Sequence, residues 1–225
     1  MGELDFLNAF TRPFSDATKM LIGLVIAIIP FVNFIFYGYV IENMKSVLGR
    51  RGLPEWKNWF DLLIEGLTGT IAALIYFLPT IIIALISMYS LVSQGLFTIE
   101  AIMNPLNWAS LTGIGILLAV GIVFYLISLY IFPAVLVHYA AQNRFDAIFE
   151  LDVIFKKVLS FNYLLSFLTV IVYSFVIGGV VSLLVGVVAL FVPLLATLMA
   201  VIVGGITTYI IFITASTLFA QAYRG

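Results

Sequence analysis

The chain has little of what soluble domains and most catalytic sites are built from. Its 225 residues include no cysteine, one histidine, and only ten basic and eleven acidic side chains. The absence of cysteine excludes disulfide, iron–sulfur and thiol-nucleophile chemistry, and His138 alone cannot form a zinc site. No phosphate-binding loop or metal-ligand motif is present, so we expect no cofactor. The cations are scattered and the formal net charge is −1, so we expect no nucleic-acid partner.

Apolar residues, by contrast, are abundant. They make up 64% of the chain and charged residues only 9%, whereas soluble domains are about a quarter charged. The mean hydropathy is +1.22. Residues 158–223 contain no Asp, Glu, Lys or Arg. The sequence therefore predicts an all-α integral membrane protein, organised as a single membrane domain over residues 1–225, with the lipid bilayer as its main surroundings.

Five apolar segments reach the length of about 20 residues that a spanning helix needs. The predicted transmembrane segments are 20–41, 66–91, 111–137, 161–190 and 194–222. Pro193 separates the last two, because proline disfavours helix in the residue before it. Three shorter helices, broken at Gly178-Gly179 and Gly204-Gly205, are an alternative for that stretch. For the first segment, the alternative is a re-entrant hairpin bent at Pro30.

Three charged segments accompany these spans, and each places aromatic side chains on one helical face. They are residues 1–14, 53–65 and 144–160. Such amphipathic pieces are typical of helices that lie in the membrane interface. The expected interfacial anchors are Trp56, Trp59, Trp108, Phe145 and Phe149.

The distribution of cations predicts an orientation in the cell membrane. Eight of the ten Lys and Arg residues fall near residues 45–57, near residues 144–157 or at Arg224. By the positive-inside rule, these charged segments face the cytoplasm. Arg12 and Lys19 join the same side only if the first apolar segment re-enters.

Small residues recur at every fourth position on the last two spans. The stripes are Ser174, Gly178, Ser182 and Gly186 on one helix, and Ala196, Ala200 and Gly204 on the next. Small residues allow helix backbones to approach closely in lipid. The hypothesis that we favour is an internal hairpin contact, and the alternative is an interface in a homo-oligomer or a larger membrane complex.

Polar groups inside the spans are few. Asn33, Ser87 and Thr208 are candidates for a polar path, although Asn33 can instead satisfy carbonyls near Pro30, and helical hydroxyls commonly bond their own helix. No acid–base set is present within the apolar segments, so we expect no enzyme. The leading hypothesis is a non-enzymatic accessory, scaffold or membrane-organising protein. The alternative is a channel or carrier for a small neutral solute or lipid.

Several short motifs resemble one uncharacterised family. They are Gly2-Glu3-Leu4-Asp5 with Pro13-Phe14, Ile29-Pro30-Phe31-Val32-Asn33 with Tyr37-Gly38-Tyr39, Leu53-Pro54-Glu55-Trp56, and Gln221-Ala222-Tyr223-Arg224. The chain is similar in these motifs to the multi-pass membrane family known as domain of unknown function 4013, found mostly in archaea and some bacteria. The Leu-Pro-Glu-Trp element is the most specific of them. The resemblance implies a prokaryotic multi-pass protein and supplies no activity, substrate or catalytic residue.

Overall fold

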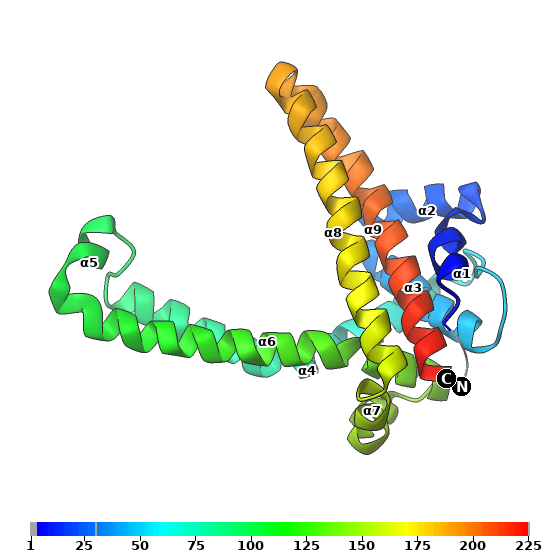
Figure 1. Ribbon diagram of the computed structural model, residues 1–225, viewed down its shortest axis with the longest axis horizontal. Coiled ribbons are helices and arrows are strands. Elements are labelled where there is room, and N and C mark those ends of the chain that lie inside the picture. Colours follow the sequence, from blue (N-terminus) through cyan, green and yellow to red (C-terminus); the bar gives the residue numbers. More distant parts are fainter. Residues whose placement is uncertain (1–3, 30, 225) are drawn as a thin grey trace. The chain divides into compact units, whose positions relative to one another are not determined.

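The fold consists of helices joined by short connections. The computed structural model describes residues 4–29 and 31–224, and no strand occurs among them. The helices, shown in Figure 1, are α1 (Phe6–Thr11), η1 (Arg12–Phe14), α2 (Ala17–Ile28), α3 (Asn33–Leu48), α4 (Trp59–Ser93), α5 (Ile99–Met103), η2 (Pro105–Asn107), α6 (Trp108–Gln142), η3 (Phe145–Phe149), α7 (Leu151–Val158), α8 (Phe161–Phe191) and α9 (Pro193–Arg224). The predicted all-α class is confirmed.

Four stretches of helix are long and apolar enough to cross a membrane. They are α4, the η2–α6 stretch Pro105–Gln142, α8 and α9, with 31 to 38 residues each. At about 1.5 Å per residue, each exceeds the hydrocarbon thickness of about 30 Å. Together with the shorter apolar helix α2, they account for the roughly five apolar segments expected. The chain is an all-α membrane protein.

Residues 20–41 do not form the single helix that the sequence predicted. They are divided between α2 and α3, which have 12 and 16 residues and are each shorter than a spanning helix. Ile29, which precedes a proline, is extended, and Phe31 has a left-handed φ of 66°. The restriction that proline places on the preceding residue interrupts the helix here. The predicted bend at Pro30 itself lies outside the described residues.

The segment 53–65 is not a separate interfacial helix. Residues 51–58 form a loop, and α4 begins only at Trp59 and continues into the apolar region. Asn58 has a left-handed φ of 54°, which prevents the helix from extending toward Trp56. The aromatic spacing that predicted an amphipathic helix therefore belongs partly to a loop.

The remaining predicted segments coincide with helices. Residues 144–160 hold η3 and α7, and the described part of residues 1–14 holds α1 and η1. The last apolar stretch is interrupted at Val192, just before Pro193, as predicted. Helices α8 and α9 continue through their glycine pairs, so the alternative of three shorter helices is wrong.

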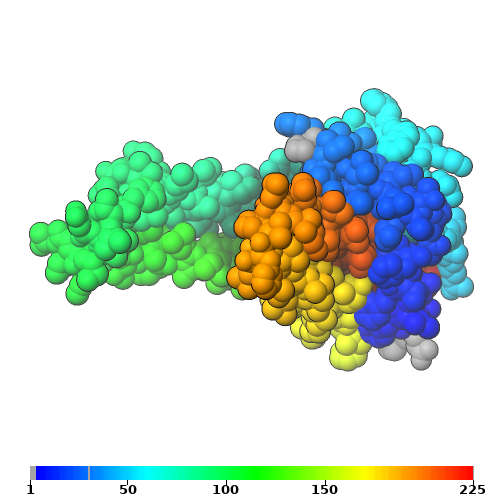
Figure 2. Space-filling model, turned by 90° about the horizontal axis from the view of Figure 1, so that it is seen from above, coloured from blue at the N-terminus to red at the C-terminus, as the bar shows by residue number. Residues whose placement is uncertain are grey.

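Contacts divide the chain into two compact units, which we describe separately. Unit 1 comprises Met1–Ile71 and Pro133–Gly225, and unit 2 comprises Ala72–Phe132. Within unit 1, α8 and α9 form an antiparallel hairpin, and α1, α2 and α3 pack against α9 (Figure 1). Figure 2 shows these N-terminal segments, in blue, beside the orange-red part of α9.

Glycines allow close helix crossings in unit 1. A Cβ atom at Gly38 of α3 would overlap the carbonyl group of Leu62, and one at Gly66 of α4 would overlap the carbonyl group of Phe34. The backbones of α3 and α4 are therefore in direct contact at their crossing. A Cβ at Gly205 of α9 would lie 2.8 Å from side-chain atoms of α2. These three positions set how α2, α3, α4 and α9 cross.

Unit 2 is a hairpin formed by parts of α4 and α6, with α5 and η2 between them. The ring of Phe77 lies 5.8 Å from the rings of both Tyr125 and Phe132, measured between centroids. The Ser128 hydroxyl donates a hydrogen bond to the Tyr76 carbonyl at 2.8 Å. The two helices are thus joined by aromatic contacts and by this hydrogen bond.

Candidate functional site

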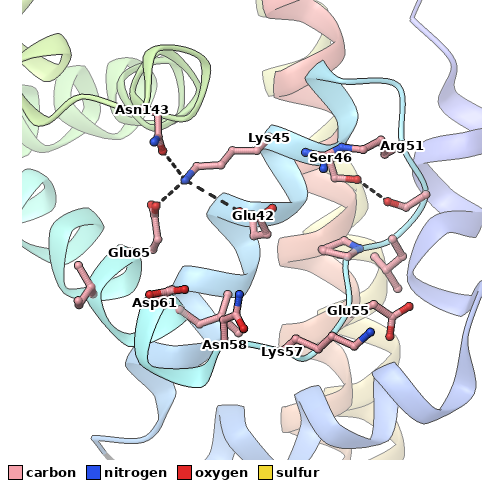
Figure 3. A pocket seen from close by; sticks show the side chains of 15 residues that line it. Glu42, Lys45, Ser46, Arg51, Glu55, Lys57, Asn58, Asp61, Glu65 and Asn143 are labelled. Carbon is pink, nitrogen blue, oxygen red and sulfur yellow. Dashed lines mark hydrogen bonds and ion pairs between the residues drawn. The ribbon is translucent and has the colours of Figure 1, made fainter.

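A polar cavity of about 650 Å³ opens in unit 1 beside the loop that joins α3 to α4 (Figure 3). Its volume falls within the range of about 300–1,000 Å³ that is common for ligand sites. The lining residues are Glu42, Lys45, Ser46, Arg51, Gly52, Leu53, Pro54, Glu55, Lys57, Asn58, Asp61, Leu62, Ile64, Glu65 and Asn143. They come from the end of α3, the loop 51–58, the first turns of α4 and the residue after α6.

Lys45 is the hub of one cavity wall. Its ammonium donates to a carboxylate oxygen of Glu65 and to Asn143 Oδ1 at 2.7 Å, and it lies 3.9 Å from a carboxylate oxygen of Glu42. The Tyr139 hydroxyl donates to the second Glu65 oxygen at 2.9 Å. These bonds join α3, α4 and α6. Lys45 and Glu65 therefore hold the wall together and are not free to bind a ligand.

Other charges in the wall are not neutralised by the protein. Within the described parts of the chain, no ion pair or hydrogen bond engages the side chains of Arg51, Lys57 or Asp61, and all three residues are exposed. Glu55, by contrast, pairs with Lys19 at 2.8 Å. The cavity thus offers free cations on its loop and a free carboxylate on α4.

A buried guanidinium lies behind the loop. Arg12 is 8% exposed and donates to Asn43 Oδ1 at 2.8 Å, to Ser46 Oγ at 3.0 Å, and to the carbonyls of Arg51 and Gly52 at 3.1 and 2.9 Å. These acceptors are neutral. Burial lowers the pKa of the Arg12 guanidinium from its ordinary value. Because three of its partners also line the cavity, Arg12 fixes the loop side of that cavity.

Asn43 extends this network into α9. Its side chain is fully buried, and its amide nitrogen donates to Ser216 Oγ at 2.9 Å and to Thr217 Oγ1 at 3.1 Å. The amide is oriented by these contacts, with its oxygen toward Arg12 and its nitrogen toward the hydroxyls. A buried polar group that loses its partner costs about 1–3 kcal/mol, so the network favours one arrangement of η1, α3 and α9.

The Leu-Pro-Glu-Trp element fastens the loop to α2 and α3. The Leu53 carbonyl accepts a hydrogen bond from Lys19 Nζ at 3.0 Å, and the Pro54 carbonyl accepts one from the Tyr39 hydroxyl at 2.9 Å. Trp56 stacks on Tyr39, with ring centroids 3.7 Å apart, and donates its indole N–H to the Lys19 carbonyl at 2.9 Å. The residues that carry the family resemblance thus hold one edge of the cavity.

A second polar network surrounds His138 near the end of α6. The His138 side chain is 1% exposed, with Nδ1 2.6 Å from the Tyr223 hydroxyl and Nε2 2.8 Å from Glu150 Oε2. Arg144 donates to the other Glu150 carboxylate oxygen at 2.7 Å. The hydrogen bond from His138, together with the charge of Arg144, lowers the pKa of Glu150. The network connects α6, the segment before α7, and α9.

The order of Tyr223, His138 and Glu150 is that of a nucleophile, a base and an orienting carboxylate. None of the three lines the cavity, however, and the Lys157 ammonium covers the Tyr223 ring, 4.9 Å from its centroid. Both imidazole nitrogens are engaged within the protein. Across residues 4–29 and 31–224, no group of three or more His, Cys, Asp or Glu residues could hold a metal ion. We interpret the His138 network as structural.

The residues predicted to form a polar path lie elsewhere. Asn33 begins α3 and Thr208 lies on α9 in unit 1, whereas Ser87 lies on α4 in unit 2. The cavity described above is lined by other residues. Ser87 donates to the Ile83 carbonyl and Thr208 to the Gly204 carbonyl, at 2.9 Å each. Both hydroxyls are therefore used within their own helices.

The predicted backbone contact between the stripes of α8 and α9 does not occur at the glycines. A Cβ atom at Gly178, Gly186 or Gly204 would meet no atom of another helix within 4 Å. Of the other stripe residues, Ala196 is buried, Ser174 is half-buried, and Ser182 and Ala200 are exposed. The helices do pack along each other, but only Val192 links them, so the short connection decides which faces meet.

The predicted interfacial anchors fall into two groups. Trp59, Trp108, Phe145 and Phe149 are 46%, 58%, 43% and 56% exposed. Trp56 is only 8% exposed, so its assignment as an anchor is wrong. In the protein core, Tyr39 gives the Trp56 ring an apolar contact, and the Lys19 carbonyl accepts a hydrogen bond from its indole N–H. A tryptophan at the membrane interface would find the same two kinds of partner in lipid and water.

Sequence reasoning missed most residues of the site. Arg12 bonds a partner 31 positions away and Asn43 one 173 positions away, separations that no local pattern reveals. The exception is the Leu-Pro-Glu-Trp element, which the family resemblance singled out.

The fold and the site define a multi-pass, all-α membrane protein with a charged cavity beside the first turns of a membrane-length helix. Residues 21–189 match the family described as protein of unknown function DUF4013, and the chain belongs to this family. The predicted family is thus confirmed. No curated protein and no solved structure matches the chain.

Proposed function

We propose that this protein is a non-enzymatic accessory or scaffold component of the cell membrane, which assembles with copies of itself or with other membrane proteins. The observation that carries the proposal is that no other helix of the described chain packs against the glycines of the small-residue stripe on α8. Gly178 and Gly186 have open space where a side chain would lie, and the most apolar part of α8 has none of its residues buried by the chain. Lipid-facing small residues are what allow a second helix to approach closely.

The polar groups of unit 1 support a structural role. Arg12, Asn43 and His138 are buried, and their hydrogen bonds are made within the protein. An enzyme needs an acid, base or nucleophile that reaches a substrate. We also propose that the charged segments of unit 1 face the cytoplasm, because most of the Lys and Arg residues lie in or near them.

The alternative of a channel or carrier for a neutral solute has less support. The hydroxyls of Ser87 and Thr208 are bonded to their own helices, and the cavity is lined by charged side chains. A charged lining suits a ligand that carries charge better than it suits a path for neutral solutes.

The test is the assembly state of the chain in native lipid. We expect the chain, extracted with its surrounding bilayer, to elute as an oligomer or with stoichiometric partner proteins. The double variant Gly178→Leu/Gly186→Leu should elute as the chain alone and should keep its unfolding temperature, because both positions face open space.

The matched control is Gly179→Leu, the same substitution on the neighbouring face of α8, where open space is also found. This variant should assemble like the natural chain. A natural chain that elutes alone, or a double variant that assembles normally, would contradict the proposal.

A further inference from the structure

We propose that the cavity of unit 1 binds the headgroup of a phospholipid that carries both a phosphate and a primary ammonium, with an acyl chain along the exposed face of α4. The inference is independent of the proposed assembly function, because it concerns the charged cavity and not the stripe of α8.

The cavity carries charges of both signs in near balance. Its lining includes four acidic residues and three basic ones. Outside the lining, Lys19 pairs with both Glu55 and Asp16, and the buried Arg12 adds a positive charge behind the loop. A ligand with a net charge would leave one unpaired charge in the cavity. A zwitterion, with one charge of each sign, matches it.

The unpaired charges of the lining lie on different elements. The free cations, Arg51 and Lys57, lie on the loop, and the free carboxylate, Asp61, lies on α4 (Figure 3). Glu42 lies on α3, with its carboxylate 3.9 Å from Lys45 Nζ. Guanidinium and ammonium groups bind phosphate oxygens, so the loop side is suited to the phosphate. Carboxylates accept hydrogen bonds from N–H groups, so the helix side is suited to the ammonium.

The lining chemistry favours a primary over a quaternary ammonium. Quaternary ammonium groups are bound by aromatic side chains, which surround them through cation–π contacts. The fifteen lining residues named above include no Phe, Tyr or Trp. An N–H donor can instead bond directly to the carboxylates of Glu42 and Asp61.

An apolar face of α4 leads away from the cavity. Phe60, Ile64, Leu67 and Ile71 recur on one side of the helix and are 71%, 47%, 40% and 49% exposed. Ile64 also lines the cavity. At about 1.5 Å per residue, this stripe extends about 16 Å along the helix. A headgroup in the cavity would therefore place an acyl chain on this stripe, which distinguishes a lipid from a free zwitterion.

The cavity also lies where a headgroup is found. Its α4 residues belong to the first two turns of a 35-residue helix. This helix is about 52 Å long, whereas the hydrocarbon layer is about 30 Å thick. The ends of α4 therefore extend into the polar region, where phosphate and ammonium groups reside.

The experiment measures binding of single lipids to the full chain, purified in detergent, by native mass spectrometry. Phosphatidylethanolamine, phosphatidylcholine and phosphatidylglycerol with identical acyl chains are compared. We expect phosphatidylethanolamine to bind about tenfold more tightly than the other two, which corresponds to one charge-assisted hydrogen bond. Equal binding of the three lipids would overturn the proposal.

Variants test the assignment of each side. Asp61→Asn and the double variant Glu42→Gln/Asp61→Asn should abolish the preference for phosphatidylethanolamine, and Lys57→Gln should weaken all three lipids. Asp61 is exposed and unpaired in the described chain, so its variant should fold normally. The controls are Asp152→Asn and Lys156→Gln on α7, which should change nothing. A preference that survives in Asp61→Asn and in the double variant overturns the assignment.

The last arm separates the lipid from a free zwitterion. Phosphoethanolamine, which has the same headgroup and no acyl chain, should fail to displace the bound lipid at equal concentration, and Ile64→Ser should weaken lipid binding. Displacement by phosphoethanolamine would overturn the lipid as ligand. Native mass spectrometry reports the number of bound lipids and the number of chains separately, so a failure of lipid binding is distinguishable from a failure of assembly.

Discussion

The interactions that stabilise unit 1 internally differ from those that stabilise unit 2 internally. Unit 1 contains buried hydrogen-bond networks around Arg12, Asn43 and His138. Unit 2 contains Glu100 as its only charged residue, and its helices are joined by the rings around Phe77 and the hydrogen bond of Ser128. Lipid offers no partners for polar groups, so a polar network is stable only where the protein itself encloses it.

The comparison shows where each kind of interaction can specify structure. Apolar contacts between helices in lipid gain little from burial, because lipid is equally apolar, and they tolerate small rearrangements. Polar networks with fixed donors and acceptors do not. We infer that unit 1 determines the arrangement of the helix ends, and that unit 2 is the more adaptable of the two.

The largest effect is expected where backbones touch. Gly66→Ala places a methyl group against the Phe34 carbonyl, which cannot shift without moving α3. We therefore expect the free energy of unfolding to fall by about 3 kcal/mol. In unit 2, Gly121→Ala meets only the side chain of Ile83, at 3.0 Å, and should cost less than about 1 kcal/mol. Thermal unfolding in detergent measures both, with Gly178→Ala as the open-space control. Equal losses at Gly66 and Gly121 would refute the contrast between the units.

The next effect concerns the buried guanidinium. Arg12→Met keeps much of the apolar volume of the side chain. It leaves four acceptors without their donor, on Asn43, Ser46 and two loop carbonyls. We therefore expect the free energy of unfolding to fall by about 2 kcal/mol. The control is Arg50→Met, at an exposed residue, which should be nearly neutral. The loop should also become more sensitive to limited proteolysis in the Arg12 variant. Unchanged stability and proteolysis would show that the network does not hold the loop.

The sequence predicted the parts of the fold that follow from hydropathy and proline. The long helices, and the break before Pro193, depend on local composition, which a single sequence displays. Trp56 was misplaced because its spacing from Trp59 and Phe60 is helical, whereas its position depends on a stack with Tyr39 and on the left-handed Asn58. Such partners are chosen by the tertiary structure.

The polar cavity was beyond prediction for the same reason. Its charges looked like an ordinary solvated segment, because nothing in the order of residues shows that Asn143 comes to lie beside Lys45. The charged networks formed where segments distant in the chain converge. Hydropathy locates the helices, but it carries no information on which helix ends meet.

A smaller effect on stability, dependent on pH, is expected at Glu150 in unit 1 and not at Glu100 in unit 2. The pKa of Glu150 is lowered from its ordinary value of 4.5 by the hydrogen bond from His138 and by Arg144. The carboxylate therefore stabilises the fold above that value, and its contribution is lost as the pH falls through the lowered pKa. Glu150→Gln should be less stable than the natural chain at pH 7, and the difference should shrink below pH 4.5.

The pH experiment has its control in unit 2, where Glu100→Gln replaces an exposed carboxylate. Unfolding temperatures are compared from pH 7 to pH 3.5, with Asp146, Lys157 and Tyr223 unchanged around the site. A Glu150 variant whose difference from the natural chain stays constant over this range would contradict the lowered pKa.

The smallest effect is expected from the hydrogen bond between Ser128 and the Tyr76 carbonyl in unit 2. Ser128→Ala removes the hydroxyl that donates to the Tyr76 carbonyl, and hydrogen bonds between membrane helices average about 0.6 kcal/mol. The rings of Phe77, Tyr125 and Phe132 remain in contact, so unfolding should shift by only a few degrees. A loss as large as that of Arg12→Met would mean that unit 2, like unit 1, is specified by polar contacts. A negligible loss would mean that unit 2 does not depend on this bond, as an adaptable unit requires.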